Sequence, residues 1–426
     1  MIAPSRLPIP FHDWLSQPLD LPAHIARALV MARLERITFG KLTVVDPHGV
    51  ETFGGAEPGP QATVRIQDAS VWTSIALGGS LGAGETYMEG LWSTDDLVAV
   101  VRILLRTSTR LTNLDGSGIG LVRETLDGLY HRIRRNTREG SRRNIAEHYD
   151  LGNDFYRLWL DDSMMYSSAI WERDDMTLEE AQYSRLDRIG RKLRLEERDH
   201  LLEIGTGWGA MAVHAATRFG CRVTTTTISK AQYQLAVERV ERARVTDRVT
   251  VLLEDYRDLR GRYDKLVSIE MIEAVGAEYL PIFFSRIERL LAPNGLAAIQ
   301  SITIPDDRYA ESVGRVDFIK RHIFPGGQLP SLHAMTAAWR HTDLRLLHME
   351  DFGEHYARTL HEWRSRFHAR RAEIDAFGHG DRFRRMWDFY LASCEGAFAE
   401  RHCGVSQLLL ARPESRRAPL VGPLQF

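Results

Sequence analysis

The chain has 426 residues, which is enough for two or three domains with well-filled cores. Its 55 Lys and Arg residues nearly cancel its 57 Asp and Glu residues, which argues against nucleic acid as a partner. No uncharged apolar run is long enough to span a bilayer, and the three cysteines lack metal-ligand spacing, so we expect a soluble, cytoplasmic protein without a metal site.

The first part of the chain reads as a separate small α+β domain. Strand patterns occupy 41–45 and 62–67, and turn residues fall between them at 46–49 and at a Pro-Gly-Pro sequence, 58–60. An apolar helix over 97–105 follows a Thr-Asp-Asp cap. These patterns predict a unit that mixes short strands with helices.

A basic segment follows this unit, with positive charge concentrated over 131–143. It is either the solvated face of a linker or a surface for phospholipid headgroups, where each basic residue contributes about 1 kcal/mol. We expect it to close a lipid-facing N-terminal domain, 1–140. The second domain, 141–426, would then begin here.

From residue 177 onward, helix and strand patterns alternate. Thr177 and Glu180 form a capping box that opens a helix with apolar residues at helical spacing. The alternation predicts a doubly wound, seven-stranded, Rossmann-like α/β sheet whose ligands bind beyond the C-terminal strand ends. The last strand is a candidate for an antiparallel one. The expected strands are 201–205, 221–227, 249–254, 264–270, 296–304, 345–351 and 405–411.

The turn after the first of these strands is rich in glycine. Gly205 and Gly207 precede a helix pattern at 211–218, so the backbone lies bare where a nucleotide-like cofactor can approach. The pattern fits a dinucleotide site, an S-adenosylmethionine (SAM) site or a turn without a ligand. A dinucleotide site normally has an acidic residue about twenty residues later, where this chain is rich in threonine, and this disfavours NAD.

Together, many ordered blocks resemble one family, the cyclopropane fatty acid synthases, which use SAM to methylate the double bond of an acyl chain. The resemblance covers about 145–412, and 82–92 is similar to the N-terminal domain of that family. The matching blocks are 148–153, 166–169, 203–209, 227–232, 255–258, 270–276, 317–331, 355–363 and 404–407.

The resemblance implies a fold and a cofactor site. The fold would be a SAM-dependent methyltransferase domain preceded by the smaller α+β domain, with a lid insertion at about 305–345 that helps to form a lipid tunnel. SAM is a sulfonium whose methyl group is already activated, so transfer needs mainly positioning and desolvation. The implied SAM-binding residues are Tyr166, Ser167, Glu203, Gly205, Gly207, Thr227, Gln232, Asp255 and Tyr256.

A second set of residues would handle the proton that ring closure releases. In the family a bicarbonate ion is the base, and the resemblance places it among Ser168, Glu273, Gln300, Tyr356 and the backbone of Ile302. Tyr149 is a further candidate catalytic residue beside Glu273.

Two of these positions depart from the family pattern, because Ser168 replaces a cysteine and Gln300 replaces a histidine. Both residues can still donate hydrogen bonds, so bicarbonate could stay bound. Glu273 could instead accept the proton itself, or the cation could lose a different proton and leave a methylated alkene without a ring.

The leading hypothesis is therefore methyl transfer to the double bond of an unsaturated acyl chain of phospholipid, with closure to a cyclopropane. One alternative is a lipid alkene C-methyltransferase whose methyl or methylene product has no ring, and another is a lipid- or SAM-binding subunit without turnover. The expected partner is phospholipid reached by peripheral contact with the inner membrane face, and the family resemblance suggests a homodimer.

Overall fold

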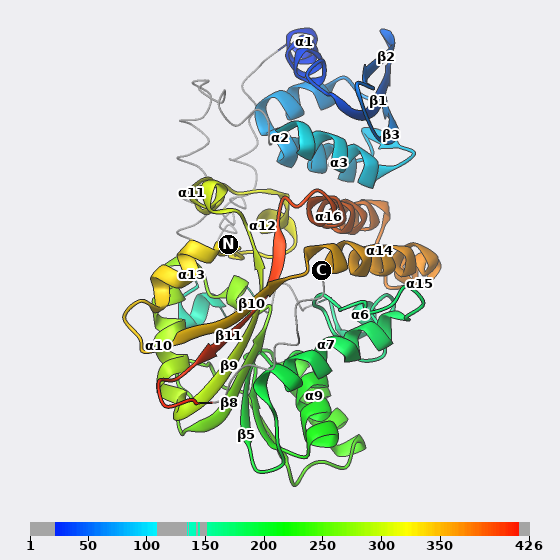
Figure 1. Cartoon of the computed structure of the whole chain (residues 1–426). Helices are drawn as coiled ribbons and strands as arrows, with labels where there is room; N and C mark the ends of the chain where they lie inside the picture. Colours follow the sequence, from blue (N-terminus) through cyan, green and yellow to red (C-terminus); the bar gives the residue numbers. More distant parts are fainter. Residues whose placement is uncertain (1–21, 109–133, 135, 142–143, 145–150, 417–426) are drawn as a thin grey trace, which may run out of the picture.

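A computed structural model describes residues 22–108, 134, 136–141, 144 and 151–416. The chain forms a small four-stranded sheet and a larger seven-stranded sheet (Figure 1). Helices α14, Gly353–Ala369, and α16, Asp381–Ala399, lie between the large sheet and the helices of the N-terminal part.

The small sheet has the order β2-β1-β3-β4. Its strands are β1, Phe39–Asp46; β2, Gly49–Gly54; β3, Glu57–Ile66; and β4, Trp92–Thr94. The expected turn at 46–49 closes the β1–β2 hairpin, while β1 and β3 run parallel. The Pro-Gly-Pro sequence at 58–60 lies inside β3 instead of separating strands. It falls in a bulge between two paired stretches, where the missing backbone N–H of proline is tolerated.

Three helices cover this sheet: α1, Ala23–Leu34; α2, Ser70–Met88; and α3, Leu97–Ser108. The expected cap of α3 is present, because the Asp96 carboxylate accepts a hydrogen bond from the Ala99 amide at 2.9 Å. Gly84 lets α2 approach the second half of the chain closely. A Cβ atom on Gly84 would lie 2.4 Å from the ring of Phe318 and 2.7 Å from that of Phe389.

The large sheet has the order β10-β11-β9-β8-β5-β6-β7, and this confirms the predicted doubly wound fold. β11 runs antiparallel to both of its neighbours, β10 and β9. The five consecutive strands from β9 to β7 in this order pair in parallel. The strands are β5, His200–Ile204; β6, Arg222–Thr226; β7, Val249–Leu252; β8, Tyr263–Ile269; β9, Leu291–Thr303; β10, Arg345–Asp351; and β11, Gly404–Ala411.

Helices connect these strands, and the predicted capping box of Thr177 and Glu180 opens the first long one. Residues 305–345 contain α11 and α12, which lie over the C-terminal ends of the strands, and α13, which packs against α10. The helices are α6, Asn153–Arg157; α7, Leu178–Leu193; α8, Ala210–His214; α9, Lys230–Arg242; α10, Leu280–Leu290; α11, Asp306–Gly314; α12, Phe318–His322; α13, Leu332–Trp339; and α15, Arg371–Ala376.

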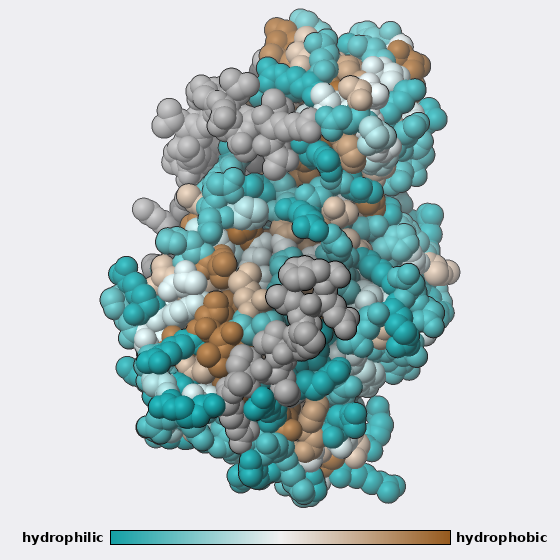
Figure 2. All heavy atoms as spheres, viewed as in Figure 1, coloured by the Kyte–Doolittle hydropathy of each residue, from teal (hydrophilic) through white to brown (hydrophobic). Residues whose placement is uncertain are grey.

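In the described ranges, no helix is both long and apolar enough to cross a membrane. Hydrophilic residues cover most of the face in Figure 2, and hydrophobic ones gather near its middle. Leu346 and Leu347 of the edge strand β10 remain 41% and 37% exposed.

A buried carboxylate joins the two halves of the molecule. Asp388 on α16 accepts hydrogen bonds from the Tyr87 hydroxyl of α2 at 2.7 Å, from Arg364 at 2.7 Å and from His368 at 2.9 Å. Burial by itself would raise the pKa of Asp388, but His368 and Arg364 outweigh burial and lower this pKa to about 2.

Asp388→Asn should destabilise the protein by roughly 3 kcal/mol, because it leaves the partly buried Arg364 without its counter-charge. The folded-state pKa lies below the ordinary value, so this stability is present at neutral pH. It should be lost as the pH falls from about 4 towards 2. Urea unfolding at several pH values measures this, with the exposed Asp381→Asn on the same helix as control. Equal stability of the two variants at pH 7 would contradict the role of Asp388.

Candidate active site

A cavity of about 600 Å³ lies at the C-terminal ends of β5 and β8, under the segment 305–345. All nine residues that the sequence assigns to SAM line it. Of the five expected catalytic residues, Glu273 and Tyr356 line the cavity, and Ser168 and Gln300 contact its wall through Glu270. Tyr149 and residues 131–133, 135 and 142–143 of the basic segment lie outside the described residues.

The glycine-rich turn forms one end of the cavity. Gly205 has φ of 99°, a conformation that a residue with a side chain rarely adopts. Its amide and that of Thr206 donate to the Thr226 carbonyl at 3.1 and 3.0 Å, which holds the turn against β6. A Cβ atom on Gly205 would lie 3.1 Å from the Met271 side chain, so only glycine leaves this backbone open to a ligand.

Glu203 occupies the end of β5 beside this turn and is 3% exposed. The Thr225 hydroxyl donates to its carboxylate at 2.7 Å and accepts in turn from Thr206 at 2.7 Å. The threonine-rich strand thus serves to hold Glu203. Burial raises the pKa of Glu203 to about 8, a shift that a cation bound in the cavity would reverse.

The remaining SAM candidates are also held by neighbours. The Thr227 hydroxyl donates to the Gln232 side chain at 2.9 Å. Arg257 makes a two-pronged ion pair with Asp255, with distances of 2.8 and 2.6 Å, and its charge keeps the pKa of Asp255 below the ordinary value although burial opposes this. Tyr256 packs edge-on against Phe283, with ring centroids 5.6 Å apart. These contacts fix the side chains before any ligand arrives.

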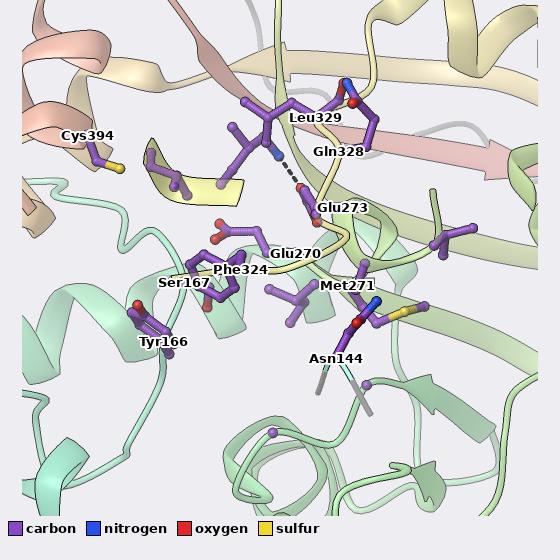
Figure 3. Close-up of a pocket in the computed structure, with 18 of the residues that line it drawn as sticks. Asn144, Tyr166, Ser167, Glu270, Met271, Glu273, Phe324, Gln328, Leu329 and Cys394 are labelled. Carbon is purple, nitrogen blue, oxygen red and sulfur yellow. Dashed lines mark hydrogen bonds between the residues drawn. The ribbon is translucent and has the colours of Figure 1, made fainter. Parts of the chain in front are cut away.

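Glu273 lies deeper in the cavity (Figure 3). Its Oε1 atom accepts hydrogen bonds from the Ile302 amide at 2.6 Å and from the Ser301 hydroxyl at 3.1 Å. Its Oε2 atom has no hydrogen-bond partner among the described residues. Burial and then the nearby charge of Glu270 raise the pKa of Glu273 to about 8.

Three of the expected catalytic residues, Ser168, Gln300 and Tyr356, form hydrogen bonds to the side chain of Glu270. The Ser168 amide and the Gln300 side chain donate to its Oε1 atom at 2.9 and 2.7 Å, and the Tyr356 hydroxyl donates to Oε2 at 2.8 Å. The Ser168 hydroxyl instead donates to the Ala169 carbonyl. Burial raises the pKa of Glu270, and the three donors oppose that rise.

The donors expected for bicarbonate therefore already serve two carboxylates of the protein. Three of them bind Glu270, and the Ile302 amide binds Glu273. These residues do not fit a separate bicarbonate ion.

The sequence analysis gave Glu270 no role of its own. The available signal was the pair of glutamates three residues apart in the block 270–276. Glu270 also has φ of 48°, which costs a residue with a side chain roughly 1 to 2 kcal/mol. The three hydrogen bonds to its carboxylate offset that strain.

A chain of polar side chains behind the cavity sets the orientation of Gln300. The Lys192 ammonium can only donate, and it donates to the Gln407 side-chain oxygen at 2.7 Å. The Gln407 NH₂ group must then face the Gln300 oxygen, which it does at 2.9 Å. The Gln300 NH₂ group is consequently turned towards Glu270. Burial lowers the pKa of Lys192 to about 8, and Glu350 supplies its counter-charge.

Arg185 is the buried cation of the cavity wall and is 1% exposed. It contacts the Met165 sulfur at 2.7 Å and the Gln182 oxygen at 2.9 Å. Burial lowers its pKa to about 10, and the charge of Glu270 is the largest effect that opposes this. The charges of Glu270, Asp161 and Glu203 all act on this guanidinium, which the sequence patterns did not identify.

Aromatic side chains complete the cavity. The Tyr166 hydroxyl lies 2.8 Å from that of Tyr390, and the Tyr166 ring stacks on Phe324 with centroids 6.0 Å apart. The far end, lined by Leu360, Ala397 and Phe398 among others, is apolar. The cavity therefore joins a polar, glycine-lined end to an apolar one.

The doubly wound sheet and the cavity at its strand ends define the chain as a SAM-dependent methyltransferase. It belongs to the mycolic acid cyclopropane synthetase family, which matches residues 136–408.

Two relatives match most of the chain. It is 37% identical over 404 residues to the tuberculostearic acid methyltransferase UfaA1 of Mycobacterium tuberculosis, and the match covers 92% of this chain and 93% of UfaA1. It is 35% identical to the cyclopropane-fatty-acyl-phospholipid synthase of Escherichia coli, with 82% and 88% covered. The structure of mycolic acid cyclopropane synthase CmaA1 complexed with SAH and CTAB has a TM-score of 0.60 at 31% identity, covering 63% of this chain and 98% of CmaA1.

Gly205→Val should weaken SAM binding at least tenfold, because a β-branched residue at this φ strains the turn by more than about 1 kcal/mol and closes the space beside Met271. Isothermal titration calorimetry with SAM measures the affinity. Gly78→Ala in α2, where an added Cβ meets nothing within 4 Å, is the control. Unchanged affinity in Gly205→Val would contradict the assignment of the turn.

Proposed function

We propose that this enzyme transfers the methyl group of SAM to the double bond of an unsaturated fatty acyl chain of phospholipid, with ring closure to a cyclopropane as the first product to test. One observation carries the proposal. A single cavity runs from the glycine turn to an apolar end, and carboxylates line it between the two. This arrangement suits a charged methyl donor and an alkene in an otherwise apolar chain.

At the cofactor end of the cavity, each of the nine residues would hold or position a different part of SAM. Glu203, Gly205 and Gly207 would hold the methionine half of SAM, Tyr166 and Ser167 would close over it, and Gln232 would reach the ribose region. Asp255 and Tyr256 would bracket the adenine, and Thr227 positions Gln232 through its hydrogen bond. SAM supplies an activated methyl group that needs no further acid or base for its transfer.

The charges of the cavity suit a cationic reaction. Glu203, Glu270 and Glu273 line the cavity with two buried cations, Arg185 and Lys320, so these carboxyl groups outnumber the buried cations of the described lining. An alkene that accepts a methyl cation becomes a carbocation, which ionised carboxylates and the faces of Tyr166 and Phe324 would stabilise. Glu273, fixed by the Ile302 amide, is one such carboxylate.

A second candidate product is a methyl or methylene derivative without a ring. Ser168 and Gln300 depart from the family pattern, and the relative UfaA1 is named a methyltransferase. Both products gain the same CH₂ and both lose a proton from the reacting region, so mass alone does not separate them.

We also propose that the enzyme draws phospholipid from the inner membrane face by peripheral contact and works as a homodimer, with residues 1–140 as a lipid-facing domain. The apolar end of the cavity supports a lipid substrate, since a free aqueous ligand would not need it.

Purified protein incubated with SAM and vesicles of a monounsaturated phospholipid should give acyl chains with upfield cyclopropane signals in proton NMR. Exocyclic methylene or vinylic methyl signals would instead show that the product is a C-methylated chain without a ring, and the rest of the proposal would stand. No release of S-adenosylhomocysteine and no change in the lipid would contradict the proposed activity. Vesicles of a fully saturated phospholipid are the control.

Glu273→Gln should lower turnover at least a hundredfold, because the neutral amide cannot stabilise a cation, while SAM affinity stays within threefold. Tyr356→Phe should cost about tenfold, because Glu270 keeps two of its three donors. The exposed Glu238→Gln on α9 is the control. Equal losses of turnover and of SAM affinity in Glu273→Gln would mean that Glu273 belongs to the cofactor site.

A further inference from the structure

We propose that Glu270 is the catalytic base of this enzyme and stands where relatives of the family would use a separate anion. The inference rests on the proposed methyl transfer to an alkene. It concerns a residue that the sequence analysis left without a role.

Three donors converge on the Glu270 carboxylate. An anion-binding pocket needs several hydrogen-bond donors aimed at one point, and the Ser168 amide, the Gln300 side chain and the Tyr356 hydroxyl meet this need. Their common acceptor is the Glu270 carboxylate. The Lys192–Gln407–Gln300 chain fixes a donor towards it, so the pocket is built to hold an ionised group.

The backbone of Glu270 is strained. Glu270 has φ of 48° directly after β8, a conformation that glycine would adopt without strain. A long charged side chain at such a position, enclosed in protein, costs free energy in both backbone strain and desolvation. The fold tolerates these costs because the strained backbone aims the carboxylate into the cavity (Figure 3).

The Glu270 carboxylate can accept more hydrogen bonds than the structure gives it. The Oε1 atom of Glu270 accepts two hydrogen bonds, whereas Oε2 accepts one, from Tyr356. A carboxylate offers about four lone-pair sites, so Oε2 keeps a site for a proton. Only Oε1 of Glu273 is anchored, by Ile302 and Ser301, and its Oε2 has no partner among the described residues, so the convergent donors and not accepting capacity favour Glu270 over Glu273.

The reaction balances with this assignment. The π electron pair of the alkene forms the new bond to the methyl carbon, the methyl–sulfur bond breaks with its pair on sulfur, and a neighbouring acyl carbon becomes a cation. For a ring, a C–H bond of the transferred methyl then gives its electron pair to a new bond with the cationic carbon. For a methylene group, a hydride first shifts from the methyl-bearing carbon to the cationic carbon, and a C–H bond of the methyl then gives its electron pair to a double bond with the methyl-bearing carbon. The proton passes to Oε2 of Glu270, which later releases it to water.

Glu270→Gly tests this assignment, because glycine relieves the strained φ and opens the space among the three donors. In buffer purged of carbon dioxide, the turnover of the wild-type enzyme should be the same with and without added bicarbonate. The variant should lose at least a hundredfold in turnover, keep SAM affinity within threefold, and recover at least tenfold with millimolar bicarbonate or formate. Glu273→Gln should show no such recovery.

Wild-type activity that falls on purging and returns with bicarbonate would overturn the proposal, as would full activity of Glu270→Gly in purged buffer. Glu270→Gln keeps the size of the side chain and should lose at least a hundredfold in turnover, which guards against a folding defect in the glycine variant. If wild type itself fails to modify unsaturated phospholipid, the proposed function fails. If wild type and both Glu270 variants are equally active, only the role of Glu270 fails.

Discussion

The central constraint on this structure is the enclosure of three carboxyl groups, Glu203, Glu270 and Glu273, around one cavity whose described lining holds two buried cations, Arg185 and Lys320. Burial raises the pKa of each carboxyl group, so each needs donors or a cation to remain ionised. Thr225, Gln300, Tyr356 and the Ile302 amide supply the donors. A sulfonium methyl donor would supply the missing positive charge, so the protein is electrostatically complementary to its reaction.

The donors reach the cavity only because distant segments meet there. The segment before α7 brings Ser168, β9 brings Gln300, and α14 brings Tyr356, all to the end of β8. β11 lies between β9 and β10 and carries Gln407, so the antiparallel strand completes the chain from Lys192 to Glu270. The helices α14 and α16 then cover this end of the sheet, and Asp388 ties them to α2 of the N-terminal part.

By itself, the sequence determined the features of the protein that depend on local patterns of residues. Apolar runs that alternate with helical patterns placed all seven strands of the large sheet, the Thr177–Glu180 pair placed a helix start, and the glycines after β5 placed the turn that lines the cavity, because each feature depends on neighbours in the chain. The Pro-Gly-Pro sequence was misread as a separator because the bulge that accommodates it requires pairing with β1. Only the tertiary structure brought Glu270 and Arg185 to the cavity and surrounded Glu270 with three donors. A glutamate or arginine is ordinary in sequence, and its chemistry is decided by the donors and charges that folding places around it.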